Sequence, residues 1–163
     1  MEDFVHVGTL ADLKMCPLMR RHTNVNGRNV SIILRNETLF CVDSVCSHMG
    51  GPLAAGDIED ICGEQVIKCP WHSYRFSLTD GKKFSKAVTF DQKTGSAITH
   101  GWSKSNESFQ RIHDVVLDNN HDIWVKLDCS TDDPVPSDRY ADDAHAAACM
   151  HTAYSQYFHS KRY

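Results

Sequence analysis

The sequence predicts an all-β protein made of short antiparallel strands. Asn26-Gly27 and Asn119-Asn120 mark tight turns between short, closely spaced β-rich runs. The runs are dominated by Val, Ile, Leu and Phe, which suit a pleated, half-buried surface. No long amphipathic helical pattern appears before residue 138. Together these observations favour strands joined by hairpins over a helical or mixed fold.

The individual elements follow from the turns that separate them. A hairpin is expected at Asn26-Gly27, another turn at 79–82, and a final hairpin at Asn119-Asn120. The expected strands are the runs at 30–34, 39–42, 74–76, 115–117 and 123–125. Ahead of them, Thr9 begins a capping-box pattern, which predicts a single helical turn.

Composition separates a tail from the domain near residue 127. Residues 1–127 carry 14 basic and 15 acidic side chains, whereas residues 128–163 carry three basic and six acidic ones. The large aliphatic and Phe side chains of the tail are only Val135 and Phe158, too few for a separate core. We therefore expect one domain over 1–127 and an acidic tail that is helical over about 138–158.

Charge and hydropathy argue against two classes of partner. The chain of 163 residues has a formal net charge of −4, which does not provide the basic surface that nucleic-acid binding needs. There is no apolar run of about 18 residues to span a membrane, and the first residues do not form a secretory signal. We expect a cytoplasmic monomer. Seven cysteines, an odd number, then indicate metal binding rather than a disulfide framework.

Four residues have the spacing of metal ligands. Cys46 and His48 form one pair, and Cys69 and His72 form a second pair twenty residues further on. Each pair places a thiolate and an imidazole within a few residues, so each can form a tight loop that presents two ligands. Glycine and proline next to both pairs fit such loops, with backbone amides turned towards sulfur. The sequence therefore predicts a site with two Cys and two His ligands.

Two kinds of metal site use two Cys and two His. A structural zinc site with these ligands usually has both cysteines in the first half of the motif and both histidines in the second. In this chain cysteine and histidine alternate instead. A Rieske-type [2Fe–2S] cluster binds two Cys on one iron and two His on the other, and alternating Cys and His supply one of each per loop. The iron–sulfur cluster is the favoured interpretation, and a zinc-binding structural module is the alternative.

Through these motifs the chain resembles the Rieske [2Fe–2S] ferredoxin family. The two motifs that carry the resemblance are Cys-Ser-His-Met-Gly-Gly-Pro-Leu at 46–53 and Cys-Pro-Trp-His at 69–72. Gly-Asp-Ile-Glu-Asp at 56–60, Gly-Trp-Ser-Lys at 101–104 and Gln-Arg-Ile-His at 110–113 are similar to the small soluble Rieske domain-containing proteins of animals. The resemblance covers residues 1–127.

The resemblance implies a fold and a function. The fold is an antiparallel β-sandwich base from 1–40 and 84–127, with an inserted cluster-binding subdomain at about 41–83. One [2Fe–2S] cluster is expected, with two cysteines on a buried iron and two histidines on an exposed iron that faces the redox partners. The function is a one-electron carrier between a reductase and an oxygenase or other acceptor. An iron–sulfur redox sensor or regulatory subunit is the alternative.

Departures from other Rieske branches suggest a low reduction potential. Gly51 and Trp71 occupy the positions of a disulfide that joins the ligand loops in the respiratory and photosynthetic complexes. Where those proteins place Ser and Tyr hydroxyls, this chain offers Tyr74 and Phe76. Fewer hydrogen bonds to the cluster lower the potential, so we expect the lower part of the range from about −150 to about +300 mV.

The tail contains a pattern close to the mononuclear iron motif of Rieske oxygenases, formed by Asp138, Asp142, His145 and His151. Those enzymes need a catalytic domain of some hundreds of residues, and only twelve residues follow His151. A helical spacing of six also turns the two histidines about 120° apart. We therefore expect an electron-transfer protein and no catalytic residues.

The remaining candidates have simpler interpretations. Cys41 lies in an expected strand and is interpreted as a small buried hydrophobe. Cys62 has no paired histidine and is not expected to be a ligand. His145 and Cys149 share a face of the predicted tail helix, which is interpreted as solvated. Residues 84–108 are expected to form a solvated loop, with partner docking as the alternative.

Overall fold

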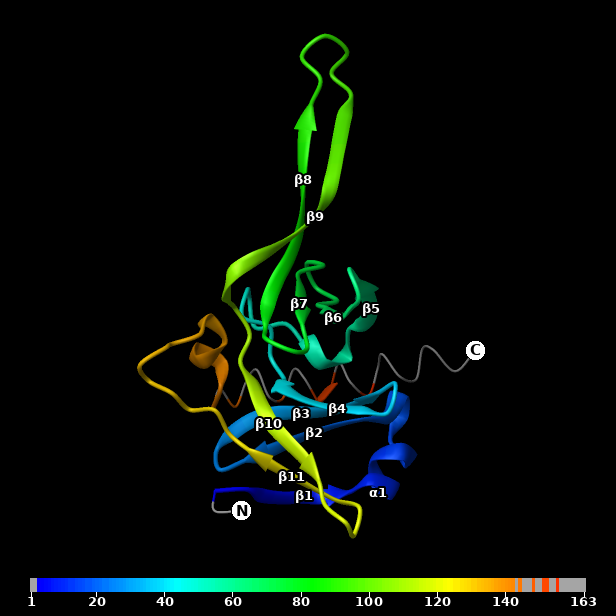
Figure 1. The fold of residues 1–163 in the computed structure, drawn as a ribbon. Coiled ribbons are helices and arrows are strands. Elements are labelled where there is room, and N and C mark those ends of the chain that lie inside the picture. The colour runs from blue at the N-terminus through cyan, green and yellow to red at the C-terminus, as the bar shows by residue number, and fades with distance from the viewer. Residues whose placement is uncertain (1–2, 143, 145–147, 149–150, 153–154, 156–163) are drawn as a thin grey trace.

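The computed structural model describes residues 3–142, 144, 148, 151, 152 and 155. The described chain forms two antiparallel sheets, one above the other in Figure 1. The all-β antiparallel fold predicted from the sequence is confirmed. No helix in this part of the chain is long and apolar enough to cross a membrane.

The lower sheet, called here the base sheet, has six strands in the order β1-β11-β10-β4-β3-β2. Its strands are β1 (Val5–Thr9), β2 (Arg20–Val25), β3 (Arg28–Arg35), β4 (Thr38–Asp43), β10 (Ile112–Leu117) and β11 (Asp122–Lys126). Both hairpins predicted at its turns are present, since β2 pairs with β3 and β10 pairs with β11. At the first turn Asn26 and Gly27 have φ values of 48° and 89°, as a tight hairpin turn with two left-handed residues requires.

The second sheet, called here the cluster sheet, has five strands in the order β5-β6-β7-β8-β9. Its strands are β5 (Asp57–Ile61), β6 (Glu64–Lys68), β7 (Arg75–Ser77), β8 (Lys82–Phe90) and β9 (Ala97–Ser108). The short helices α1 (Leu10–Met15), η1 (Pro17–Met19) and η2 (Leu53–Ala55) lie between strands, and the short helix η3 (Pro136–Tyr140) follows β11. The predicted helical turn is α1, and the Thr9 hydroxyl caps it by accepting from the Asp12 amide at 3.1 Å.

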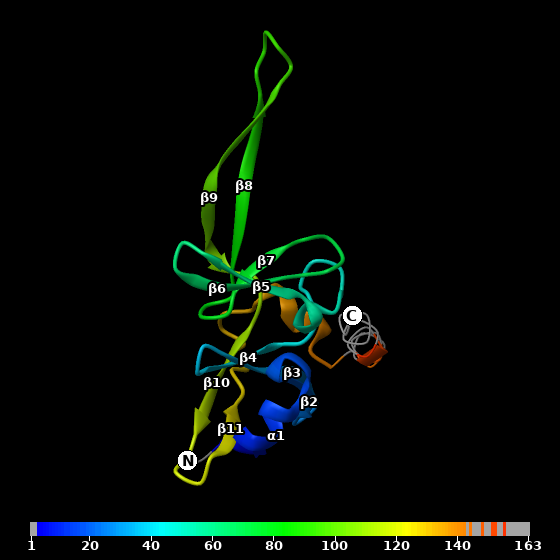
Figure 2. The same ribbon diagram turned by 90° about the vertical axis from the view of Figure 1, so that its right-hand side faces the viewer.

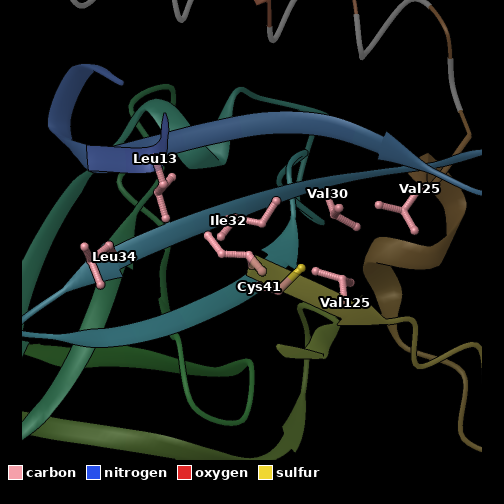
Figure 3. Packing of buried hydrophobic residues seen from close by; sticks show 8 residues of the cluster. Leu13, Val25, Val30, Ile32, Leu34, Cys41 and Val125 are labelled. Atoms are coloured by element: carbon pink, nitrogen blue, oxygen red, sulfur yellow. The ribbon is translucent and has the colours of Figure 1, made fainter. Parts of the chain in front are cut away.

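Two of the apolar clusters among the described residues stabilise the base sheet and its packing against the cluster sheet. The first lies within the base sheet and is shown in Figure 3; its buried members are Leu13, Val25, Val30, Ile32, Leu34, Cys41, Ile123 and Val125. Cys41 is fully buried there, which raises the pKa of its thiol and confirms its interpretation as a small hydrophobe. The second cluster joins the two sheets and contains Ile33, Val42, Cys46, Leu53, Ile67, Cys69, Phe76 and Leu78. Both predicted cysteine ligands therefore belong to the core between the sheets.

Residues 84–108 differ from the prediction in two ways. They form most of a long hairpin of β8 and β9, not a solvated loop, and this hairpin pairs with β7 in the cluster sheet, not with the base. Figures 1 and 2 show the hairpin standing away from the rest of the molecule. Its outer residues are exposed on both faces, so the sequence lacks the one-sided apolar alternation that marks a half-buried strand.

The tail begins differently from the helix predicted over 138–158. The short helix η3 starts at Pro136 and ends at Tyr140. Beyond it, residues 144, 148, 151, 152 and 155 have helical backbone, while the other residues of the predicted helix from 145 on, His145 and Cys149 among them, lie outside the described residues. The prediction is therefore not tested over most of its length.

Candidate iron–sulfur site

Two loops from different parts of the chain form the candidate site. The first follows β4 and carries Cys46 and His48, and the second joins β6 to β7 and carries Cys69 and His72. Each loop is closed by two backbone hydrogen bonds across its cysteine: the Cys46 amide donates to Gly51 O at 2.8 Å, and the Cys69 amide donates to Tyr74 O at 2.7 Å. The Gly50 and Ser73 amides donate back to the two cysteine carbonyls at 3.0 Å each.

The two predicted cysteine ligands lie together in the buried half of the site. Each side chain is 1% exposed. The Cys46 thiol hydrogen-bonds to Cys69, which raises the pKa of Cys46 and lowers that of Cys69 to about 7. Backbone amides also reach the sulfurs, from His48 and Met49 to Cys46, and from Trp71 and His72 to Cys69. The predicted orientation of loop amides towards sulfur is thus present, and such bonds stabilise a thiolate.

The two predicted histidine ligands lie together in the outer half of the site. The rings of His48 and His72 have centroids 4.9 Å apart and are perpendicular, and His48 stacks on Tyr74 at 4.1 Å. His72 is exposed, whereas His48 is partly buried. The Nδ1 atom of His48 is buried and has no hydrogen-bond partner among the described residues. A buried ring nitrogen without a hydrogen bond fits a metal ligand, because coordination would satisfy its lone pair.

The donor set pairs thiol with thiol and imidazole with imidazole. This arrangement suits a two-iron cluster in which one iron binds two sulfurs and the other binds two nitrogens. Within the described part of the chain, no three His, Cys, Asp or Glu side chains are placed to hold a single metal ion. The residues present fit the asymmetric cluster that the sequence motifs predict.

Comparison with known proteins identifies the family. Residues 5–130 match the family described as soluble Rieske-type ferredoxins. The chain belongs to this family. A human Rieske domain-containing protein is 37% identical over 123 residues, which cover 76% of this chain and 74% of the relative. The resemblance drawn from the two motifs is confirmed, and membership of the family implies an iron–sulfur cluster.

Two solved structures show that the fold of this ferredoxin is shared. The ferredoxin of carbazole 1,9a-dioxygenase from Nocardioides aromaticivorans IC177 matches with a TM-score of 0.53 at 22% identity, covering 78% of this chain and all of that one. A putative NADH-dependent nitrite reductase small subunit from Mycobacterium tuberculosis matches with a TM-score of 0.56 at 12% identity, covering 78% of this chain and 96% of that one. At sequence identities this low, the similarity establishes a shared fold and nothing further.

The structure of the ferredoxin adds a residue that supports the first ligand loop. Gln110 is fully buried and sits between β9 and β10. Its Nε2 donates to Asp43 O at 3.0 Å and Val45 O at 2.8 Å, while its Oε1 accepts from the Ser47 amide at 3.1 Å. All three partners are backbone groups, so no side-chain pattern in the sequence pointed to this role.

The other described residues considered as metal ligands from the sequence lie outside this site. Cys62 is exposed in the turn between β5 and β6. Asp138, part of the oxygenase-like pattern, pairs with Arg28 at 2.5 Å and with Arg111 at 2.5 Å. Asp142 and His151 are exposed. The structure thus uses Asp138 for ion pairing.

Proposed function

We propose that this ferredoxin carries one electron at a time on a [2Fe–2S] cluster held by Cys46, His48, Cys69 and His72. The observation that carries the proposal is the pairing of two buried thiols with two outer imidazoles, one of them with a buried, unbonded Nδ1. When bound, such a cluster supplies a site that gains and loses a single electron. We take residues 1–127 as the cluster-binding domain and 41–83 as its cluster-binding part.

Different residues would hold the cluster and pass the electron to a partner. Cys46 and Cys69 would hold one iron in the core between the sheets, where water is excluded. Neutral imidazoles in place of two thiolates would make the site less negative by about two charges, which eases electron uptake. The exposed ring of His72 would bring the electron to the surface, where a partner can approach it.

We propose a reductase as the electron donor and an oxygenase or another redox enzyme as the acceptor. The support is the likeness of the fold to the ferredoxin of a carbazole dioxygenase and to a nitrite reductase small subunit. The chain would transfer electrons without a substrate of its own. We place it in the cytosol, a reducing compartment that keeps thiols such as the exposed Cys62 and Cys129 free.

The first test is spectroscopy of the purified protein. We expect a red-brown protein with about two irons and two sulfides per chain, and a rhombic Rieske-like EPR signal after reduction with dithionite. Cys69→Ser should abolish both the colour and the signal, whereas Cys62→Ser should retain them. A colourless protein that contains zinc would contradict the proposal.

A groove beside His72 indicates where the partner docks and what charge it carries. The groove has a volume of about 520 Å³, and its lining includes His72, Arg75, Lys83, Lys86 and Trp102, with no acidic side chain. Arg75 is paired with Glu59 at 2.7 Å. Lys83 and Lys86 form no ion pair with any described residue, and both lie over aromatic rings. We propose that an acidic face of the redox partner docks here.

Charged oxidants test this docking charge. The reduced protein would transfer one electron to the ferricyanide trianion or to the tris(phenanthroline)cobalt(III) trication. Lys86→Glu should slow the first reaction and speed the second, changing the ratio of the two rate constants several-fold. A change in the reduction potential of the protein would alter the driving force of both reactions equally, so it largely cancels in the ratio of the rate constants. Lys93→Glu, at the hairpin tip, makes the same change of net charge and should leave the ratio nearly unchanged. Equal ratios in both variants would rule out a basic docking groove.

A further inference from the structure

The chain returns to the candidate site after the last strand. Residues 135–140, called here the strap, contain η3 and lie between the levels of the two sheets, in orange in Figures 1 and 2. The strap lies beyond residue 130, where the match to the ferredoxin family ends. Its sequence, in an acidic tail with few apolar residues, gave no sign of a role at the site.

The strap is anchored on the base sheet by buried groups. Val135 and Ser137 are 9% and 1% exposed. The Ser137 hydroxyl donates to Asp43 Oδ2 at 2.5 Å and accepts from the Arg111 amide at 2.9 Å. The carboxylate of Asp138 accepts from Arg28 at 2.5 Å and from Arg111 Nε at 2.8 Å. Hydrogen bonds and ion pairs thus fix the strap to β3, to β4 and to the loop before β10.

From this anchor the strap reaches the first ligand loop. A single nitrogen of Arg139, Nη2, donates to the carbonyl oxygens of Ser47 and of His48, the latter at 2.7 Å. The ring of Tyr140 lies over the same loop, only 3.3 Å from the place where a side chain on Gly50 would begin. Arg139 in turn lies 4.8 Å from the centre of the Tyr140 ring. One cation therefore holds two consecutive carbonyls of the loop, including that of a proposed iron ligand.

We propose that Arg139 is a positioning residue of the iron–sulfur site, and that the strap is part of that site. Two effects follow. The Nη2 group of Arg139 bridges two carbonyls and so restrains the loop from opening, which slows loss of the cluster. Its fixed positive charge also lies beside the histidine half of the site, where it favours the reduced, more negative state and raises the reduction potential. This inference rests on the proposed ligand set.

The experiment compares single variants of the full-length, cluster-loaded protein. Arg139→Gln should lower the reduction potential measured by protein-film voltammetry. It should also speed cluster loss to an iron chelator roughly tenfold or more, followed by the loss of visible colour. Arg139→Lys should restore most of the potential, because it keeps the charge. It should restore only part of the slow cluster loss, because a flexible, strongly hydrated ammonium holds the two carbonyls less firmly than the preorganised guanidinium. Lys93→Gln, which removes a distant charge, should match the wild type in both measurements.

The outcomes separate this inference from the proposed function. If wild-type protein shows no Rieske-like EPR signal, the proposed function fails. If the wild-type signal is present and Arg139→Gln has the wild-type potential and chelation rate, the role of Arg139 is overturned. If Arg139→Gln does not fold, Ser137→Ala supplies the test, because it loosens the anchor and retains Arg139. Faster chelation in Ser137→Ala supports the strap, and an unchanged rate contradicts it.

Discussion

At the scale of single residues, the side chain of His48 gives the most direct structural support for a metal site. A buried polar atom left unsatisfied costs about 1–3 kcal/mol, so native proteins rarely contain one without a reason. The Nδ1 atom of His48 is such an atom, and its ring is held between His72 and Tyr74. The sequence predicted His48 and His72 through their spacing to cysteine, but only the structure shows that one ring is partly buried and the other exposed.

Replacing His72 with Cys tests the charge argument for the two histidines. A thiolate in place of a neutral imidazole adds about one negative charge to the site, so the reduction potential should fall. Protein-film voltammetry measures the change, and the EPR signal confirms that a cluster is still bound. His100→Cys adds a thiol on β9, outside the site, and should leave the potential unchanged. A potential that does not fall in His72→Cys would show that ligand charge does not set it.

Gly51 is predicted to tolerate a side chain poorly in this chain, where Trp71 and Cys69 lie close to it. A Cβ atom at this position would lie 3.0 Å from Cys69 Sγ and 3.1 Å from the Trp71 ring, closer than ordinary contacts. Gly51→Ala should therefore push the two ligand loops apart and reduce the iron bound per chain. Gly101→Ala is the matched control, because a Cβ there would meet nothing within 4 Å. Equal iron content in the two variants would contradict the packing argument.

At the scale of elements, the sequence was informative where turns are local and one face is buried. The hairpin at Asn26-Gly27 and the cap at Thr9 depend on neighbouring residues, so they were predictable. The meeting of the two Cys- and His-bearing loops was predictable, because the spacing of their residues is typical of metal ligands; that they bind a metal stays a prediction. The support given by Gln110 and Arg139 was not, because both side chains bind backbone carbonyls of a loop more than 60 residues away. Every residue has a backbone carbonyl, so a single sequence does not indicate which one a distant side chain binds.

Asp43 connects several of these elements and gives a prediction about stability. It accepts from Arg28 through both oxygens at 2.7 Å, from His113 at 3.0 Å and from Ser137 at 2.5 Å. Burial alone would raise the pKa of Asp43, but the hydrogen bonds from His113 and Arg28 outweigh it and lower the pKa. Asp43→Asn removes the buried charge that faces Arg28 and His113 and leaves Arg28 paired with Asp138 alone. We therefore expect a loss of about 2 kcal/mol in the free energy of unfolding at pH 7.

The pH dependence of that loss has a defined sign. Because the pKa of Asp43 is lowered in the folded state, its contribution is complete above the unfolded value of about 4 and disappears as the pH falls through the lower folded value. Urea unfolding at pH 7, 5 and 3 should show the same gap between wild type and Asp43→Asn at the first two values, and a smaller gap at pH 3. A gap that grows at pH 3 would mean that the carboxylate is not held ionised.

At the scale of the whole molecule, we predict that the outer half of the β8–β9 hairpin is separable from the core. Its inner half completes the cluster sheet, where Phe84 is buried with Ile61 and Val66. Its outer half projects from the body, and Val88, Phe90 and Ile98 are exposed there. The apolar clusters within and between the sheets contain no residue from 85–101. The sequence did not predict the outer half of the hairpin, because a segment that packs against nothing has no buried face to set an apolar pattern.

Shortening the hairpin tests whether its outer half is independent of the fold. Removing residues 88–99 and joining Ala87 to His100 through Asn-Gly retains Lys86 and Trp102 beside His72. Since the removed segment buries almost nothing, the midpoint of thermal unfolding should stay within about 4 °C of wild type, a shift worth roughly 1 kcal/mol or less. The EPR signal and the oxidant ratio should also be unchanged, because the site and its two unpaired lysines remain. Loss of the cluster, or a much larger fall in the midpoint, would show that the outer hairpin is coupled to the core. An altered oxidant ratio alone would instead extend the docking surface along the hairpin, beyond the groove at His72.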